Sequence, residues 1–180
     1  LHVVSRKMKR RIITLFLFIL CIQSQSQQLF FTGYSLQNGL SQSVVTCILQ
    51  DSRGYIWFGT QNGLNRFNGY SFEVFTYRPD DTTSISNNWI YGMAEARHGN
   101  LWIGTKGGLN CFLQKEKRFT RIHYGIPYPV DVTDYVYDVK CSRIGSILIN
   151  TPPVLSILDP DRMEFSHAVA PLAYDGSIKD

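Results

Sequence analysis

The side chains most capable of chemistry in this chain are scattered, and none of them falls into a recognised catalytic or metal-binding pattern. His98, His123 and His167 lie far apart and lack the short spacings of metal ligands. Asp80 and Asp81 are adjacent acids that could bind a cation, although a solvated loop explains them better. There is no Gly-x-Ser-x-Gly segment, phosphate-binding loop or Cys/His pair. The sequence therefore predicts no catalytic residue, no cofactor and no metal site.

Three cysteines follow the N-terminal region: Cys47, Cys111 and Cys141. Their number is odd and no Cys-x-x-Cys spacing occurs, which argues against a disulfide scaffold. One disulfide between two of these cysteines is the alternative in an oxidising compartment. We favour the interpretation that they are buried free thiols on strands.

The N-terminus has the order of a secretory signal, in which a basic cluster precedes an apolar run. The run Ile12–Ile22 covers 11 residues, whereas a membrane-spanning helix needs about 20. We predict a signal peptide over residues 1–26, with Met8 as the natural start and cleavage after Ser24 or Ser26. An uncleaved anchor is the alternative.

The net charge of +4 comes from this signal region. Five of the 18 basic residues lie within the first eleven positions, and the remaining thirteen nearly balance the 14 acids. No cationic surface is needed to explain the charge, so we expect no nucleic-acid binding.

The dominant feature of the sequence is an internal repeat of 45 residues. Eight of the fourteen positions in Gly54–Phe67 are identical to those in Gly99–Phe112, and Ser41 likewise matches Ser86. We assign the identical positions as a structural repeat motif: Gly54, Trp57, Gly59, Thr60, Gly63, Leu64, Asn65, Phe67, Gly99, Trp102, Gly104, Thr105, Gly108, Leu109, Asn110 and Phe112. A third copy is degraded. In this copy, residues 134–139 occupy the place of 88–93. Residues 145–151 then correspond to 99–105, but they are displaced by one residue from the 45-residue spacing.

Each copy is interpreted as four short antiparallel strands in a meander. Asn62-Gly63 and Asn68-Gly69 predict type I′ hairpin turns, in which both central residues have positive φ. The consecutive apolar residues Ile56-Trp57-Phe58 indicate a strand buried on both faces, so packing explains the tryptophan better than a ligand platform does. Gly59 and Gly104 would let a neighbouring backbone approach closely, or would mark bulges.

A four-stranded meander that recurs every 45 residues is typical of a propeller blade. The predicted class is all-β: a partial β-propeller, with two clear and one degenerate four-stranded antiparallel blades, after an N-terminal signal helix. The predicted segments are a lead-in strand at 27–40 that could complete the last blade of a ring, blade 1 at 41–80, blade 2 at 81–125, degenerate blade 3 at 126–170, and the start of a further unit at 171–180. His98 and Asp159-Pro160-Asp161 are interpreted as solvated turns.

The run from Asp51 to Phe67, with Asn38-Gly-Leu-Ser41 before it, resembles the two-component regulator propeller repeat. His98–Thr105 is similar to a second copy, and the resemblance covers about residues 30–165. It implies the N-terminal sensor part of a hybrid two-component histidine kinase, exported to the periplasmic side of the inner membrane. Such receptors continue into further propeller blades, a β-sandwich, a membrane helix and kinase and receiver domains. Many of them sense oligosaccharides.

The partners that the resemblance implies are the rest of the propeller and receptor chain, an oligosaccharide ligand and a second copy in a homodimer. Loops would supply the ligand contacts, because aromatic rings stack on sugars and polar groups orient them. The longest loops are Tyr77–Asn88 and Tyr124–Val132, and the candidate ligand residues are Tyr77, Tyr124 and Tyr128. The alternatives are an exported propeller enzyme of the lyase or glycosidase type and a protein-interaction scaffold, for which we find no positive feature.

Overall fold

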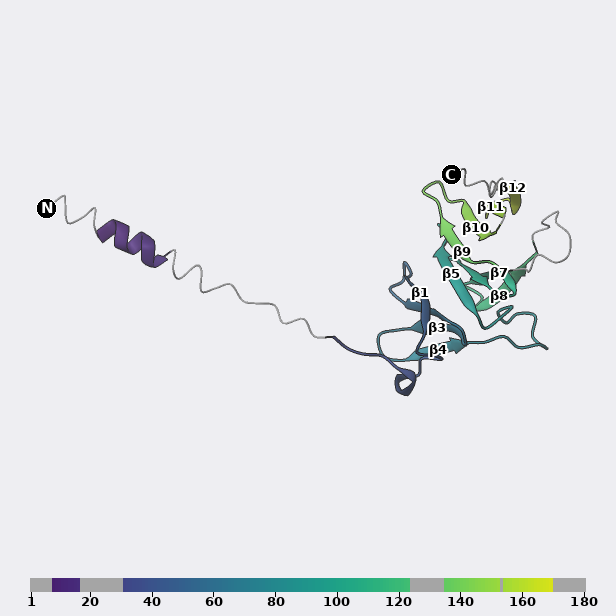
Figure 1. Ribbon diagram of the computed structural model, residues 1–180, viewed down its shortest axis with the longest axis horizontal. Helices are drawn as coiled ribbons and strands as arrows, with labels where there is room; N and C mark the ends of the chain where they lie inside the picture. Colours follow the sequence, from purple (N-terminus) through teal and green to yellow (C-terminus); the bar gives the residue numbers. More distant parts are fainter. Residues whose placement is uncertain (1–7, 17–30, 124–134, 153, 170–180) are drawn as a thin grey trace, which may run out of the picture. The chain divides into compact units, whose positions relative to one another are not determined.

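The computed structural model describes residues 8–16, 31–123, 135–152 and 154–169, and the chain divides into two units after Gly33. In the first unit, residues 8–16 are helical and include the start of the predicted apolar run (Figure 1). Within the described ranges, no helix has the length and apolar character needed to cross a membrane. The predicted cleavage positions, Ser24 and Ser26, lie outside the described residues.

The described residues of the second unit form three four-stranded antiparallel sheets, in each of which the strands pair in chain order. Blade 1 consists of β1 (Val45–Gln50), β2 (Ile56–Thr60), β3 (Gly63–Phe67) and β4 (Phe72–Phe75). Blade 2 consists of β5 (Ile90–Glu95), β6 (Leu101–Thr105), β7 (Gly108–Leu113) and β8 (Arg118–Ile122). Blade 3 consists of β9 (Asp138–Cys141), β10 (Ile147–Thr151), β11 (Val154–Asp159) and β12 (Glu164–Val169). The partial propeller predicted from the sequence is therefore confirmed.

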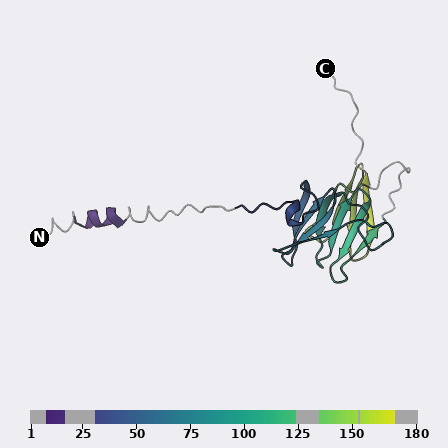
Figure 2. The same ribbon diagram turned by 90° about the horizontal axis from the view of Figure 1, so that it is seen from below.

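Neighbouring blades pack face to face, and their first strands lie against each other, β1 with β5 and β5 with β9 (Figures 1 and 2). One apolar core lies between blades 1 and 2 and includes Trp57, Leu64, Ile103 and Phe112. A second core lies between blades 2 and 3. Its members include Trp102, Leu109, Val139, Ile147 and Leu158. Trp57 is 0% exposed and Trp102 is 3% exposed, so both tryptophans of the repeat motif are core residues, as predicted.

The glycines of the second strands permit this close stacking. A Cβ atom on Gly104 would lie 2.7 Å from the backbone oxygen of Val136 in the next blade. A Cβ atom on Gly59 would lie 2.9 Å from Cγ2 of Ile90 and 2.5 Å from Sγ of Cys47. The predicted close approach of a neighbouring backbone is confirmed at Gly104. At Gly59 the nearest atoms belong to side chains, those of Ile90 in the next blade and Cys47 in the same blade.

The hairpins lie where the sequence places them, but the predicted turn type is wrong. The loop between β2 and β3 is Gln61-Asn62, because Thr60 pairs with Gly63. Gly63 has a φ of 118°, whereas Asn62 is not among the described residues with positive φ. The Thr60 hydroxyl accepts a hydrogen bond from the Asn62 N–H at 3.0 Å and donates to the Gly63 carbonyl at 2.8 Å. This side-chain turn closes the loop without a positive φ at Asn62. Asn68-Gly69 likewise has positive φ only at Gly69.

The described part of the lead-in segment, 31–40, contains a short 3-10 helix, η1 (Leu36–Asn38), and no strand. The predicted strand would pair with the last blade of a complete ring, and the described sheets include no such blade. The Tyr34 ring instead packs on Phe67 and Phe72, with centroid distances of 4.8 and 5.8 Å. Whether residues before 31 complete a ring remains a prediction.

Candidate functional site

Of the three predicted ligand residues, the structure describes only Tyr77. It follows β4 and is 40% exposed. One face of its ring is covered by the guanidinium of Arg121, which lies 5.3 Å from the ring centroid. Tyr124 and Tyr128 lie outside the described residues.

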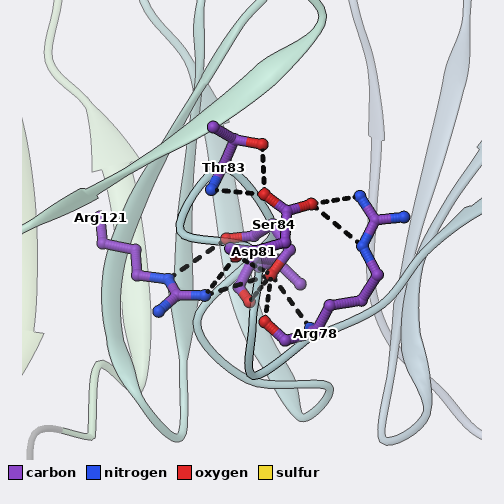
Figure 3. A network of polar contacts seen from close by, with 6 residues as sticks. Arg78, Asp81, Thr83, Ser84 and Arg121 are labelled. Atoms are coloured by element: carbon purple, nitrogen blue, oxygen red, sulfur yellow. Dashed lines mark hydrogen bonds and ion pairs between the residues drawn. The ribbon is translucent and has the colours of Figure 1, made fainter.

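The loop after Tyr77 is held by its own polar groups (Figure 3). The Asp81 carboxylate accepts hydrogen bonds from the Thr83 N–H at 2.9 Å and from Nε of Arg78 at 3.0 Å. From β8, Arg121 donates to the Asp81 carbonyl at 3.0 Å and to the Ser84 hydroxyl at 3.1 Å. Hydrogen bonds from Thr83 and the ion pair with Arg78 lower the pKa of Asp81 to about 2. The loop is therefore ordered by its own polar contacts, and the Asp81 carboxylate already has its hydrogen-bond and ion-pair partners within it.

Two concave surfaces lie between blades. A groove of about 270 Å³ runs between β4 and β8 and is lined by Glu73, Phe75, Arg78 and Lys117 among others. A smaller pocket of about 90 Å³ lies between turns of blades 2 and 3. Beside it, Nε2 of His98 lies 3.2 Å from an Asp161 oxygen, and both side chains are about 70% exposed. These two residues occupy solvated turns, as the sequence indicated.

A buried Ser–Thr–Asn cluster has the residue types of a hydrolytic site, but its geometry is structural. Asn65 accepts a hydrogen bond from the Ser41 N–H and donates to the Ser41 hydroxyl, both at 2.8 Å. The Ser41 hydroxyl also lies 3.0 Å from that of Thr60. Blade 2 repeats the same contacts with Ser86, Thr105 and Asn110 at matching distances. No histidine or acid bonds either cluster in the described residues, so we interpret each as a clasp that fixes the chain entering its blade.

His167 has a side-chain partner that its position in the sequence did not indicate. Its Nδ1 lies 2.8 Å from the hydroxyl of Ser156, because the two residues are cross-strand partners on β11 and β12. A nucleophile–base pair needs a third group to orient the base, and no acid bonds His167 in the part of the chain that the structure describes. The same ranges contain no group of three residues suited to a metal ion.

The cysteines of the described unit are free thiols on β1, β7 and β9, as favoured from the sequence. Cys111 is buried, whereas Cys47 and Cys141 are partly exposed. Burial raises the pKa of the Cys111 thiol to about 12 and that of Cys47 above its usual value. Neither of these two thiols is activated as a nucleophile.

A bulge in the first strand of both clear blades displaces one side chain from the regular ladder. In β1 the register shifts between Val45 and Cys47, which leaves Thr46 as the extra residue. In β5 it shifts between Ile90 and Gly92, which leaves Tyr91. The single proton of the Thr46 hydroxyl lies between two acceptors, the carbonyl of Gly59 at 3.0 Å and that of Ile90 at 2.8 Å, and the contact with Ile90 ties blade 1 to blade 2.

Tyr91 belongs to a cluster of four rings contributed by blades 2 and 3. Its centroid lies 5.9 Å from that of Trp89, 5.1 Å from Tyr137 and 6.4 Å from Tyr135. The Lys106 ammonium lies 5.3 Å from the Trp89 ring centroid and 5.5 Å from that of Tyr135. We call these five residues the aromatic platform. Burial and the neighbouring Tyr137 raise the pKa of Tyr91, so its hydroxyl remains a donor at neutral pH.

The platform was not predicted from the sequence, although the repeat contains a signal for it. Residues 134–139 stand in the place of 88–93, which sets Tyr135 and Tyr137 against Trp89 and Tyr91. These aromatic residues are absent from blade 1, so they do not belong to the motif that the two clear copies share.

Comparison with known proteins identifies the repeat. A family model described as the two component regulator propeller matches residues 39–62 and 84–107, which contain the first two hairpin strands of blades 1 and 2. In these two segments, blades 1 and 2 are similar to that repeat. Over 75 residues, the chain is 42% identical to a histidine kinase, "Histidine kinase P4" of Formosa agariphila; the match covers 41% of this chain and 6% of that protein.

Solved structures of other proteins have a similar architecture. The extracellular domain of a hybrid two component system of B. thetaiotaomicron is 25% identical, with a TM-score of 0.67 over 77% of this chain and 20% of that one. A virginiamycin B lyase of Staphylococcus aureus, 16% identical, has a TM-score of 0.59 over 79% of this chain and 46% of that one, and its likeness shows the fold alone. The chain thus spans only a small part of the receptor proteins that it matches.

Proposed function

We propose that this chain belongs to the exported sensor region of a hybrid two-component receptor, and that this region recognises a carbohydrate-type ligand. The observation that carries the proposal is the pair of regulator propeller repeats within a structure similar to the extracellular domain of such a system. The sequence match to a histidine kinase supports the same assignment. The basic and apolar N-terminal run supports export.

The role of the propeller in this proposal is to bind ligand and to bias signalling, without chemistry of its own. Signal would pass as a population shift in a homodimer, which requires the ligand to bind one arrangement of the two receptor copies more tightly than the other. The rest of the propeller and receptor chain would carry the kinase and receiver functions.

The experiment uses the full-length receptor to which we propose this chain belongs, reconstituted in lipid nanodiscs and mixed with a panel of oligosaccharides. We expect at least one oligosaccharide to bind in calorimetry and to change the rate of autophosphorylation from ATP. Separate Ala substitutions of Tyr77, Tyr124 and Tyr128 test whether the two predicted loops contribute to this affinity. Absence of autophosphorylation, or cleavage of the bound oligosaccharide with turnover, would overturn the receptor assignment and favour a propeller enzyme.

A further inference from the structure

We propose that the aromatic platform binds a saccharide ring bearing an anionic group, a carboxylate or a sulfate. This inference rests on the proposed carbohydrate-sensing function, and it specifies both the place and the ligand class. The rings would pack on the apolar face of the sugar, and Lys106 would pair with its anionic group.

Blade 1 shows that packing alone does not require the platform. At the positions equivalent to Trp89, Tyr91 and Lys106, it has Val44, Thr46 and Gln61. It nevertheless forms the same four-stranded sheet, with the same bulge in its first strand. Only in blades 2 and 3 do aromatic residues occupy these places, so the rings are additions to a fold that forms without them.

The rings present a surface that remains partly open. Tyr137 is 45% exposed, and Trp89, Tyr91 and Tyr135 are each partly exposed. The bulge places Tyr91 outside the regular alternation of the strand, and bulges are common next to binding sites for this reason. Aromatic faces with a few convergent polar groups are the usual lining of small-ligand sites. The hydroxyls of three tyrosines supply those polar groups.

Lys106 supplies the preference for a charged ligand. It is the one cation within the platform, and none of the described acids forms an ion pair with it. Asp138, which follows Tyr137 directly, lies 3.2 Å from Lys140 instead. The Lys106 ammonium is therefore held over the rings by cation–π contact, where it can also neutralise an anionic group on a stacked sugar.

The test measures binding to the intact protein by calorimetry, using paired probes that differ only in charge. The acidic members are oligogalacturonates and sulfated galactan oligosaccharides, and each has a neutral partner made by carboxyl reduction or desulfation. We expect one acidic probe to bind about tenfold or more tightly than its neutral partner, with the preference weakening at high salt. Lys106→Met should abolish the preference, whereas Lys140→Met, at a cation already paired with Asp138, should leave it intact.

Tyr137→Ala separates this site from other sites on the protein. We expect it to weaken binding of both members of the pair about tenfold, because stacking with either sugar is lost. Circular dichroism must show an unchanged fold, and Tyr137→Phe should retain most of the affinity. Tyr70→Ala, at a tyrosine that is 96% exposed between β3 and β4, should have no effect on this binding.

The outcomes distinguish this inference from the proposed function. Equal affinity for charged and neutral partners, or unchanged affinity in Tyr137→Ala, overturns the platform assignment while the receptor assignment stands. Failure of all acidic probes to bind, with a neutral oligosaccharide still changing autophosphorylation, has the same meaning. Loss of both oligosaccharide binding and autophosphorylation removes the proposed function together with this inference.

Discussion

The two tryptophans of the repeat motif occupy equivalent positions in blades 1 and 2, yet their indole N–H groups have different environments. Trp57 donates to the buried carboxylate of Asp51 at 2.8 Å, and Gln114 of blade 2 donates to the same carboxylate at 3.3 Å. In blade 2 the residue equivalent to Asp51 is Ala96, and the indole N–H of Trp102 has no partner among the described residues. The first interface is thus joined by a polar contact, whereas the second is apolar at this point.

The bulge shows the same divergence between copies. Thr46 uses its hydroxyl to bind blade 1 to blade 2, whereas Tyr91 at the equivalent position contributes a ring to the aromatic platform. Positions that are identical in both repeats maintain the packing of the blades. Positions that differ are free to acquire individual roles, and the comparison of blades locates them.

The largest expected effect comes from the glycines that separate the blades. Gly104→Ala should lower the free energy of unfolding by about 3 kcal/mol, because its Cβ meets the backbone oxygen of Val136, which cannot move independently. Gly59→Ala should cost less, since its Cβ meets mainly the side chains of Ile90 and Cys47. Urea unfolding monitored by tryptophan fluorescence measures both. Equal losses of unfolding free energy in the two variants would show that blades 2 and 3 can move apart as easily as the side chains of Ile90 and Cys47 can repack.

The next effect concerns Asp51, the acid that only blade 1 has. Asp51→Ala should lower the free energy of unfolding by about 2–3 kcal/mol, because Trp57 and Gln114 lose a charged acceptor in a buried place. Ala96→Asp is the matched variant in blade 2. It offers the orphaned Trp102 N–H an acceptor, and we expect a gain of up to about 1 kcal/mol.

Both Asp51 and Ala96 variants are compared with wild type in the same unfolding assay. Ala96→Asn serves as the control that adds an acceptor without burying a charge. A loss of stability in Ala96→Asp larger than that in Asp51→Ala would contradict the view that the missing acid is what distinguishes the two interfaces.

Substitutions in the Ser–Thr–Asn clusters, which blades 1 and 2 share, should lower the free energy of unfolding by a smaller amount that is the same in both blades. Asn65→Ala and Asn110→Ala each remove both hydrogen bonds to the serine that precedes the blade. We expect each to cost about 1–2 kcal/mol of unfolding free energy, and the two values to agree within about 0.5 kcal/mol. A clear difference between them would mean that one cluster has a role beyond holding the entering chain.

The smallest effect is the pH dependence of the loop between blades 1 and 2. The pKa of Asp81 is about 2 in the folded chain, below its unfolded value, so its contribution to stability is present above about pH 4 and is lost as the pH falls toward 2. The difference in melting temperature between wild type and Asp81→Asn should therefore disappear in this window. Asp80→Asn, whose carboxylate takes no part in the network of Figure 3, should show no such change. A pH-independent difference for Asp81→Asn would argue against the ionised network.

The fold was predictable because the blade pattern is local. Aromatic strands and short hairpins recur in each 45-residue repeat, and they predicted the three sheets and the burial of Trp57 and Trp102. The turn type was wrong because the hydroxyl of Thr60, two positions before Asn62, closes the loop instead of a pair of positive φ angles. The pair of Ser156 and His167 escaped notice because strand register, which the sequence leaves open, makes them neighbours.

The order of residues in this chain was enough to establish a repeat, its strands and its core, since each depends on side-chain type at short spacing. It was not enough to establish which side chains meet across blades. Tyr91 and Tyr137 are 46 positions apart, and Asp51 and Gln114 are 63 apart. These contacts exist only because the blades stack at a fixed register, and the candidate ligand site depends on that stacking.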